Sequence, residues 1–205
     1  FSSLQVTEIK CVATAVLRDH PRSKVFIEFI KEKFNLTIEV ISGEKEAYLT
    51  AVGLISGISE VNGVAADLGG GSLELIEINN RVIGKLSSLA LGTKIITTRK
   101  LQNLEDITRI IRVEYGNYQY ENLYLIGGAL RFICRFFIEF NKYPLKNLHN
   151  LSISKEDFSL YLKNIKEFQR NKFKLNSRTL NPNALIVAQA MLEVFQPKNI
   201  IVSIF

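Results

Sequence analysis

The sequence predicts a mixed α/β fold in which helices flank a mixed sheet. Two observations favour this class. Short apolar segments typical of strands alternate with amphipathic helical segments, and a tight glycine loop after residue 60 joins two strands into a hairpin. The chain has 205 residues, 47% of them hydrophobic, so it can bury the core of one large domain or two small ones.

The first part of the chain is expected to alternate strands and helices. Residues 11–15 form a short apolar segment typical of a buried strand, and residues 37–41 alternate and contain β-branched side chains. Between them, the apolar positions of residues 23–34 recur at helical spacing. Residues 44–54 are expected to form a second helix.

A Gly- and Ser-containing loop at residues 56–62 is the best candidate for a domain boundary. We therefore divide the chain into residues 1–58 and 59–205. After the boundary we expect a hairpin that ends at Ile78. The later strands are expected at 82–86 or beyond, 122–126 and 200–205, and the later helices at 94–100, 104–115, 129–140, 154–168 and 182–195.

Composition limits the ligands and the compartment. The net charge is +6 and the pI about 9.3, which suits an anionic ligand without choosing among nucleic acid, nucleotide and polyphosphate. Two distant cysteines, Cys11 and Cys134, predict neither disulfides nor a zinc site. No apolar run is long enough to span a bilayer and no signal-peptide pattern is present, so we expect a cytoplasmic protein.

One stretch places three consecutive glycines between two acidic residues: Asp67-Leu68-Gly69-Gly70-Gly71-Ser72-Leu73-Glu74. Consecutive glycines let backbone N–H groups point at an anion without crowding by Cβ atoms. Asp67, at the end of the first strand, can hold a cation directly or through water. Taken alone, the stretch has two interpretations, a loop that binds phosphate and a hairpin turn without a ligand. It favours both about equally.

Two upstream motifs carry charge. Arg18 follows a strand end, where its planar guanidinium suits phosphate, although a surface ion pair is the simpler explanation. Glu44 and Glu46 stand in the first turn of the helix that begins after Ser42, where they complement the helix dipole. Because Glu46 lies one turn inside, it is the better candidate for a general base.

Two downstream features each have a functional and a structural interpretation. Gly127 and Gly128, between a strand and a helix, suit either a second phosphate contact or close strand–helix packing. Residues 141–178 hold nine Lys or Arg against three Asp or Glu, which favours a solvated helix face over a positive lip beside an anion site.

In chain order these signals are Thr-Ala-x-x-Arg (14–18), Ser-Gly-x-x-Glu-Ala (42–47), Asp-x-Gly-Gly-Gly-Ser-x-Glu (67–74) and a late Gly-Gly. Together they resemble the exopolyphosphatase and guanosine pentaphosphate phosphatase (Ppx/GppA) family of the actin-like ATPase superfamily. The resemblance covers nearly the whole chain. It implies an actin-like, ribonuclease H-like fold, in which residues 1–58 are the C-terminal part of a first such domain and 59–205 form a second.

The resemblance also implies roles for individual residues. Glu46 would be the general base that activates water, and Arg18 would bind and neutralise phosphate. Asp67 and Glu74 would hold Mg²⁺, with Glu74 also beside the substrate and the attacking water. The phosphate loop would consist of Gly69, Gly70, Gly71 and Ser72.

The sequence departs from the family pattern in four places, of which the replacement of a frequent Thr by Leu73 should matter little. An N-terminal phosphate loop, Asp-x-Gly-Ser-Asn-Ser in the family, is absent, and a Gly-Leu-Arg-x-Gly stretch does not follow the last strand. Ala129 stands where the family commonly has Thr after Gly-Gly, which removes a hydroxyl. We therefore expect a fragment that lacks the first phosphate loop.

The implied reaction is Mg²⁺-dependent hydrolysis of a terminal phosphoanhydride of polyphosphate or guanosine pentaphosphate, with no nucleic acid or membrane as partner. The resemblance leaves a homodimer open. The alternative is a non-catalytic remnant or a phosphate- or nucleotide-binding module of the same fold. An actin-like ATPase or sugar kinase is a third hypothesis, disfavoured by the Ser-Gly-x-x-Glu-Ala motif. The basic residues of 141–178 lean weakly toward a long polyanion.

Overall fold

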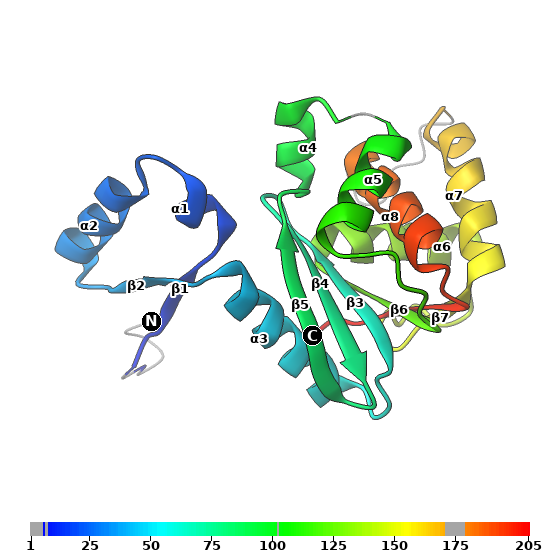
Figure 1. The fold of residues 1–205 in the computed structure, drawn as a ribbon, viewed down its shortest axis with the longest axis horizontal. Coiled ribbons are helices and arrows are strands. Elements are labelled where there is room, and N and C mark those ends of the chain that lie inside the picture. Colours follow the sequence, from blue (N-terminus) through cyan, green and yellow to red (C-terminus); the bar gives the residue numbers. More distant parts are fainter. Residues whose placement is uncertain (1–5, 7, 102, 171–178) are drawn as a thin grey trace.

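The computed structural model describes residue 6 and residues 8–101, 103–170 and 179–205. Within these residues the chain forms a small two-stranded sheet near the N-terminus and a six-stranded mixed sheet in the remainder (Figure 1). Helices lie against both faces of the larger sheet. The structure therefore confirms the predicted mixed α/β class.

The N-terminal unit is a strand–helix–helix–strand arrangement with parallel strands. It consists of β1 (Cys11–Ala13), α1 (Ala15–Asp19), α2 (Ser23–Phe34) and β2 (Ile38–Val40). The prediction of a strand over residues 11–15 was wrong at its end. The carbonyl of Thr14 accepts hydrogen bonds from the N–H groups of Leu17 and Arg18, both at 3.0 Å, so the chain coils into α1 instead of continuing as a strand.

The six-stranded sheet combines a three-stranded antiparallel part with parallel strands. Its strands are β3 (Gly63–Leu68), β4 (Leu73–Asn79), β5 (Val82–Leu89), β6 (Asn122–Ile126), β7 (Ser152–Ser154) and β8 (Asn199–Val202), in the order β5-β4-β3-β6-β8-β7. The pairs β3–β6 and β6–β8 are parallel, whereas β3–β4, β4–β5 and β7–β8 are antiparallel. The predicted hairpin across the glycine loop is confirmed.

Alternating residues of the central strands face two different cores. Ala65 on β3 and Ile76 on β4 pack with helix α3 (Gly43–Gly57), whereas Val64 and Ala66 face the opposite side. That side is covered by α4 (Thr93–Arg99), α5 (Leu104–Glu114), α6 (Gly128–Phe140), α7 (Lys155–Arg170) and α8 (Pro182–Phe195). Figure 1 shows α3 on one side of the sheet and the cluster of α5 to α8 on the other.

Helix ends follow the predicted capping residues in several places. Ser42 caps α3 by accepting a hydrogen bond from the N–H of Lys45 at 3.1 Å. Asn181 caps α8, with Pro182 in the first turn, and Ser154 exchanges hydrogen bonds with Asp157 at the start of α7. These local signals account for the agreement between predicted and observed helix starts.

Strand ends differ more from the predictions. The last strand was expected over residues 200–205, but β8 ends at Val202. Beyond it, the N–H of Phe205 donates a hydrogen bond to the Ser203 hydroxyl at 3.2 Å. Residues 87–89, expected in a loop, extend β5 because they pair with residues 73–75 of β4. Strand β7 was not predicted; it has three residues and exists through pairing with β8.

Helix α3 belongs structurally with the larger sheet. Its buried residues Ala47, Ala51 and Leu54 form one core with β3 and β4. The proposed boundary at residue 58 stays a prediction, but the helix that it assigned to the first domain packs against the sheet of the second.

The described part of the basic stretch, residues 141–170, lies around β7 and α7. Figure 1 shows α7 on the side of the molecule away from α1 and α3. Residues 171–178, which carry the rest of the stretch, fall outside the described residues. Among the described residues, no helix is both long and apolar enough to cross a bilayer.

Candidate functional site

Asp67 and Glu74 are direct partners across the β3–β4 hairpin. Residues opposite each other in an antiparallel pair project from the same face of the sheet, so both carboxylates lie on the α3 side, next to the pair Ala65 and Ile76. Ser88 continues this row on β5, and its hydroxyl donates a hydrogen bond to Oε1 of Glu74 at 2.8 Å. The sheet therefore presents a polar row beside an otherwise apolar core.

The two carboxylates are protonated more readily than carboxylates in water. Burial raises the pKa of Glu74 from 4.5 to about 7, against the opposing hydrogen bonds of Ser72 and Ser88. Burial also raises the pKa of Asp67, and the negative charge of Glu46 adds to this effect. A hydrogen bond from Thr50 and the positive charge of Arg131 act in the opposite direction. Burial is the main cause of both raised pKa values, and the neighbouring carboxylates add a smaller effect in the same direction.

Helix α3 positions a third carboxylate at this edge of the sheet. Glu46 and Thr50 are one turn apart on the same face, and the Thr50 hydroxyl donates to Oδ2 of Asp67 at 3.4 Å. A Cβ on Gly43 would stand 2.4 Å from the Cβ of Ser88. Only glycine therefore allows the first turn of α3 to approach β5 this closely, which places Glu46 beside the polar row.

Arg18 and Glu46 form an ion pair between α1 and α3. Nη1 of Arg18 donates to Oε2 of Glu46 and to the carbonyl of Ile41, both at 3.2 Å. The side chains of Arg18 and Glu46 are 23% and 21% exposed, so both reach solvent. No described residue donates a hydrogen bond to the other oxygen of Glu46, which leaves that oxygen free to accept a proton.

The glycine loop of residues 69–72 is tightly packed on two sides. A Cβ on Gly71 would stand 2.6 Å from Cβ of Ala15 on α1, and a Cβ on Gly92, at the start of α4, would stand 2.3 Å from the carbonyl carbon of Gly71. The N–H of Gly69 donates to the carbonyl of Ser72. The N–H groups of Gly70 and Gly71 donate to no acceptor among the described residues, so they are available to an anion.

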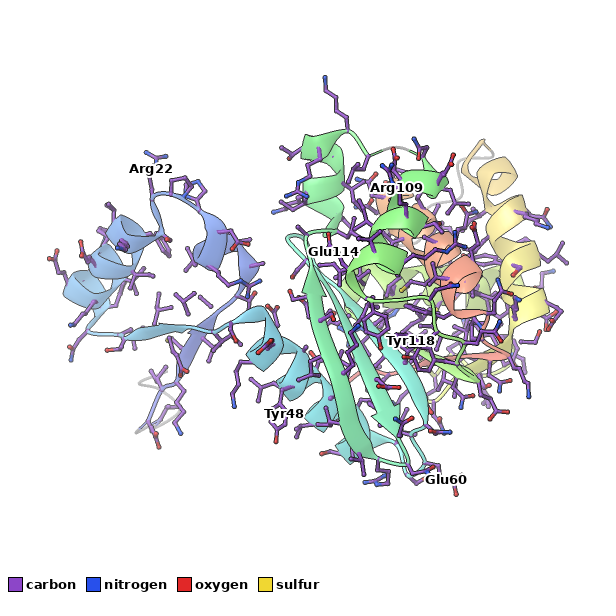
Figure 2. All side chains as sticks on the ribbon, viewed as in Figure 1. Arg22, Tyr48, Glu60, Arg109, Glu114 and Tyr118 are labelled. Carbon is purple, nitrogen blue, oxygen red and sulfur yellow. The ribbon has the colours of Figure 1, made fainter. Side chains whose placement is uncertain are left out.

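A cavity of about 500 Å³ opens beside the loop. Arg18, Gly43, Gly71, Ser72 and Ser88 are among the residues that line it. Glu114 also lines it, and Figure 2 shows this residue at the end of α5 next to β5. Of the residues singled out in the sequence, those that line the cavity include Arg18, Glu44, Gly71 and Ser72. The carboxylates of Glu46, Asp67 and Glu74 are not among the lining residues.

Gly127 has a structural role. It adopts a positive φ of 82°, and a Cβ there would stand 2.4 Å from Oδ1 of Asp67. Glycine is therefore required for the end of β6 to approach Asp67. This geometry supports the packing interpretation of the late Gly-Gly motif.

The sequence matches the Ppx/GppA phosphatase family over residues 1–204. The chain belongs to this family. A curated relative from Fusobacterium nucleatum, a bifunctional 3-dehydroquinate synthase/phosphatase, is 28% identical over 224 aligned residues, which cover 98% of the chain and 34% of the relative. The chain thus spans about a third of the length of this curated relative.

Solved structures of Ppx/GppA proteins share the fold. An exopolyphosphatase from Cytophaga hutchinsonii superposes with a TM-score of 0.85 at 19% identity, covering 99% of the chain and 73% of the other protein. The Ppx/GppA family member from Aquifex aeolicus gives a TM-score of 0.76 at 20% identity, covering 100% and 72%. At this level of identity the likeness establishes the actin-like fold of the family.

Two carboxylates of the site carry the oxygen donors that Mg²⁺ prefers. The described residues contain no group of three or more His, Cys, Asp or Glu side chains that could hold a metal alone. In phosphoryl-transfer sites, however, Mg²⁺ is commonly held by one or two carboxylates, water and substrate phosphates. Asp67 and Glu74, side by side on one sheet face, match that donor set.

Sequence reasoning missed Thr50, Ser88 and Arg131. Thr50 could have been found, because it follows Glu46 at a spacing of four residues in a predicted helix. Ser88 reaches Glu74 only through the β4–β5 register, which residues expected in a loop did not reveal. Arg131 lies in α6, and its positive charge acts to lower the pKa of Asp67. Its guanidinium donates a hydrogen bond to the carbonyl of Ile204 at 2.8 Å.

Proposed function

We propose that this chain carries the active-site half of a phosphohydrolase that cleaves a terminal phosphoanhydride bond by attack of water. The observation that carries the proposal is the meeting of Arg18, Glu46 and the Asp67–Glu74 pair beside a loop with two free N–H donors. Phosphoryl transfer depends mainly on positioning and on neutralising charge, and these groups provide both.

Each residue has a defined part in the proposed reaction. Arg18 and the N–H groups of Gly70 and Gly71 bind the non-bridging oxygens of the terminal phosphoryl group. Glu46 accepts a proton from the attacking water, and the ion pair with Arg18 fixes the direction of its carboxylate. Asp67 and Glu74 would hold Mg²⁺, which when bound neutralises charge on the phosphate oxygens.

Membership of the Ppx/GppA family and the exopolyphosphatase among the structural neighbours support inorganic polyphosphate as a substrate. Guanosine pentaphosphate is the second candidate that the family name supports. A phosphate-binding module without turnover is the alternative function.

Phosphate release tests the proposal directly. The chain is incubated with Mg²⁺ and either polyphosphate or guanosine pentaphosphate, and Glu46→Gln is compared with Glu60→Gln. Glu60 is a matched control, because Figure 2 shows it at the end of the sheet opposite Glu114 and the cavity. We expect Glu46→Gln to lower turnover by about 10²–10⁴-fold, the usual contribution of a general base, and Glu60→Gln to leave it unchanged.

The outcomes separate the two functions. Equal rates for Glu46→Gln and the unmutated chain contradict the general-base role. Binding of the phosphate compounds without release of phosphate by the unmutated chain supports the binding module and overturns the hydrolase.

A further inference from the structure

The glycine loop has a second flank that the proposed reaction does not use. Gly71 faces α1, the helix that carries Arg18, while Gly70 faces α4. A Cβ on Gly70 would meet Cδ, Cε and Cγ of Lys94 at 3.5, 3.7 and 3.8 Å. The stem of Lys94 therefore runs along Gly70, and its ammonium group lies one bond beyond Cε, next to the loop.

The positive charge of Lys94 has no partner in the described structure. No hydrogen bond, ion pair or aromatic ring among the described residues engages its Nζ, and its side chain is exposed. Some other lysines, in contrast, are engaged. Lys85 donates to the carbonyl of Tyr115, and Lys198 pairs with Glu121 at 3.4 Å. An unpaired cation next to free N–H donors is an arrangement that favours an anion.

The position of Lys94 is fixed by its helix. Its backbone N–H donates to the carbonyl of Gly70 at 2.9 Å, and that of Thr93 donates to Gly69 at 3.0 Å. Asn183 on α8 holds the same helix, because its amide donates to the carbonyl of Thr93 at 2.8 Å and to the hydroxyl of Thr97 at 2.7 Å. These hydrogen bonds fix the start of α4 relative to the glycine loop. The backbone of Lys94 is therefore already ordered, which lowers the loss of conformational entropy when the lysine binds a ligand.

We propose that Lys94 is a second phosphate-binding cation, which contacts the phosphoryl group next to the one held by Arg18. The inference rests on the proposed function, since it assumes a phosphate at the glycine loop. A condensed phosphate chain carries charge on each phosphoryl group, so cations on the two flanks of one loop match two consecutive groups of the same ligand. Lys94 thus selects ligands with at least two linked phosphates over orthophosphate.

Calorimetric binding in Mg²⁺ tests this assignment with tripolyphosphate, orthophosphate and guanosine 5′-triphosphate. Lys94→Met keeps the stem over Gly70 and removes the charge. Lys163→Met, on an exposed lysine of α7 that has no partner among the described residues, is the matched control for the loss of one positive charge.

We expect Lys94→Met to weaken tripolyphosphate binding by about tenfold, as for the loss of a charge-assisted hydrogen bond to phosphate. The same variant should change orthophosphate binding by less than about twofold, because orthophosphate has no second phosphoryl group. Lys163→Met should change the binding of every ligand by less than about twofold, because salt screens distant exposed charges. Lys94→Arg should restore tripolyphosphate binding. If Lys94→Met loses a similar part of its affinity for guanosine 5′-triphosphate, the site recognises the phosphate chain that the two ligands share. If the loss is confined to tripolyphosphate, the site is restricted to inorganic chains. Both outcomes support the role of Lys94.

Two results overturn the inference and point to different errors. If the unmutated chain binds none of the ligands, the proposed function fails and the role of Lys94 fails with it. If the unmutated chain binds them but Lys94→Met matches Lys163→Met, or weakens orthophosphate and tripolyphosphate equally, only the second-phosphate role is wrong.

Discussion

The three carboxylates of the site are held in different ways. Glu46 is paired with Arg18, and Asp67 accepts a hydrogen bond from Thr50. Glu74 is the most buried, at 1% exposed, and its described partners are hydroxyl groups, not cations. Without metal, its negative charge is therefore the least compensated of the three, and its protonation should be visible in the stability of the protein.

Stability of the metal-free chain should fall as pH rises through the range in which Glu74 ionises. Burial raises its pKa to about 7, against 4.5 for an exposed Glu, so the folded state binds the proton more tightly than the unfolded chain. This contribution to the free energy of unfolding is complete below pH 4.5 and is lost as pH approaches 7. It amounts to about 3 kcal/mol at most.

Urea unfolding with a chelator present, at a series of pH values between 4.5 and 7.5, measures this effect. Glu74→Gln mimics the protonated side chain and keeps an acceptor for the Ser88 hydroxyl. We expect the free energy of unfolding of this variant to exceed that of the unmutated chain increasingly as pH rises. Parallel curves for the two proteins would show that Glu74 ionises normally.

At the scale of elements, the site depends on close contact between the glycine loop and helix starts. The start of α4 touches the loop through Gly92, whereas a Cβ on Gly128, at the start of α6, would meet no neighbouring atom within 4 Å. Two glycines at similar places in the chain therefore differ in what they permit. Gly92 is required for packing, and Gly128 is not.

Gly92→Ala should displace the loop, because its Cβ would lie 2.3 Å and 2.4 Å from backbone carbons of Gly71 and Gly70. Backbone atoms cannot rotate away as a flexible side chain can, so we expect a loss of about 1–3 kcal/mol in the free energy of unfolding together with weaker phosphate binding. Gly128→Ala, the control, should be neutral or slightly stabilising. Urea unfolding and phosphate calorimetry on both variants check this. A fully stable Gly92→Ala variant with unchanged binding would contradict the packing argument.

Local chemistry explains which elements the sequence could predict. Helix α2 and strand β6 have the expected bounds, because the spacing of the apolar residues within each segment is enough to identify it. Strand β7 and the end of β5 depend on partners distant in sequence, so no local pattern marks them. The candidate site divides in the same way. Its charged residues and glycines lie in short motifs, whereas Ser88 joins them only through strand pairing.

At the scale of the whole molecule, the N-terminal unit is much less buried than the rest. Helix α2 has no buried residue, and its large apolar side chains Val25, Phe26, Phe29 and Phe34 are exposed. All of these but Phe34 line an apolar cavity of about 500 Å³ together with residues of α1. Figure 1 shows α1 and α2 on the left. The buried residues of this part, Ala15 and Ile41, lie where it meets the glycine loop and α3. A two-stranded sheet with so little core is marginal by itself.

Opening of the N-terminal unit should therefore be separable from unfolding of the large sheet. Phe195 is fully buried and packs edge-on against Tyr115 and Tyr120, with ring centroids 5.6 and 5.7 Å away. Phe29 is 49% exposed on α2. We expect Phe195→Ala to lower the stability reported by hydrogen exchange at β6 and β8 by about 3–5 kcal/mol.

Phe29→Ala should leave the exchange of β6 amides unchanged and accelerate exchange only in α2, because α2 opens before the sheet does. If instead both variants lower the protection of β6 by similar amounts, the chain unfolds as one cooperative unit and the N-terminal part is as stable as the sheet. Arg18 belongs to the weakly held unit and Glu46 to the stable one, so each opening of the unit would break their ion pair and withdraw Arg18 from the site.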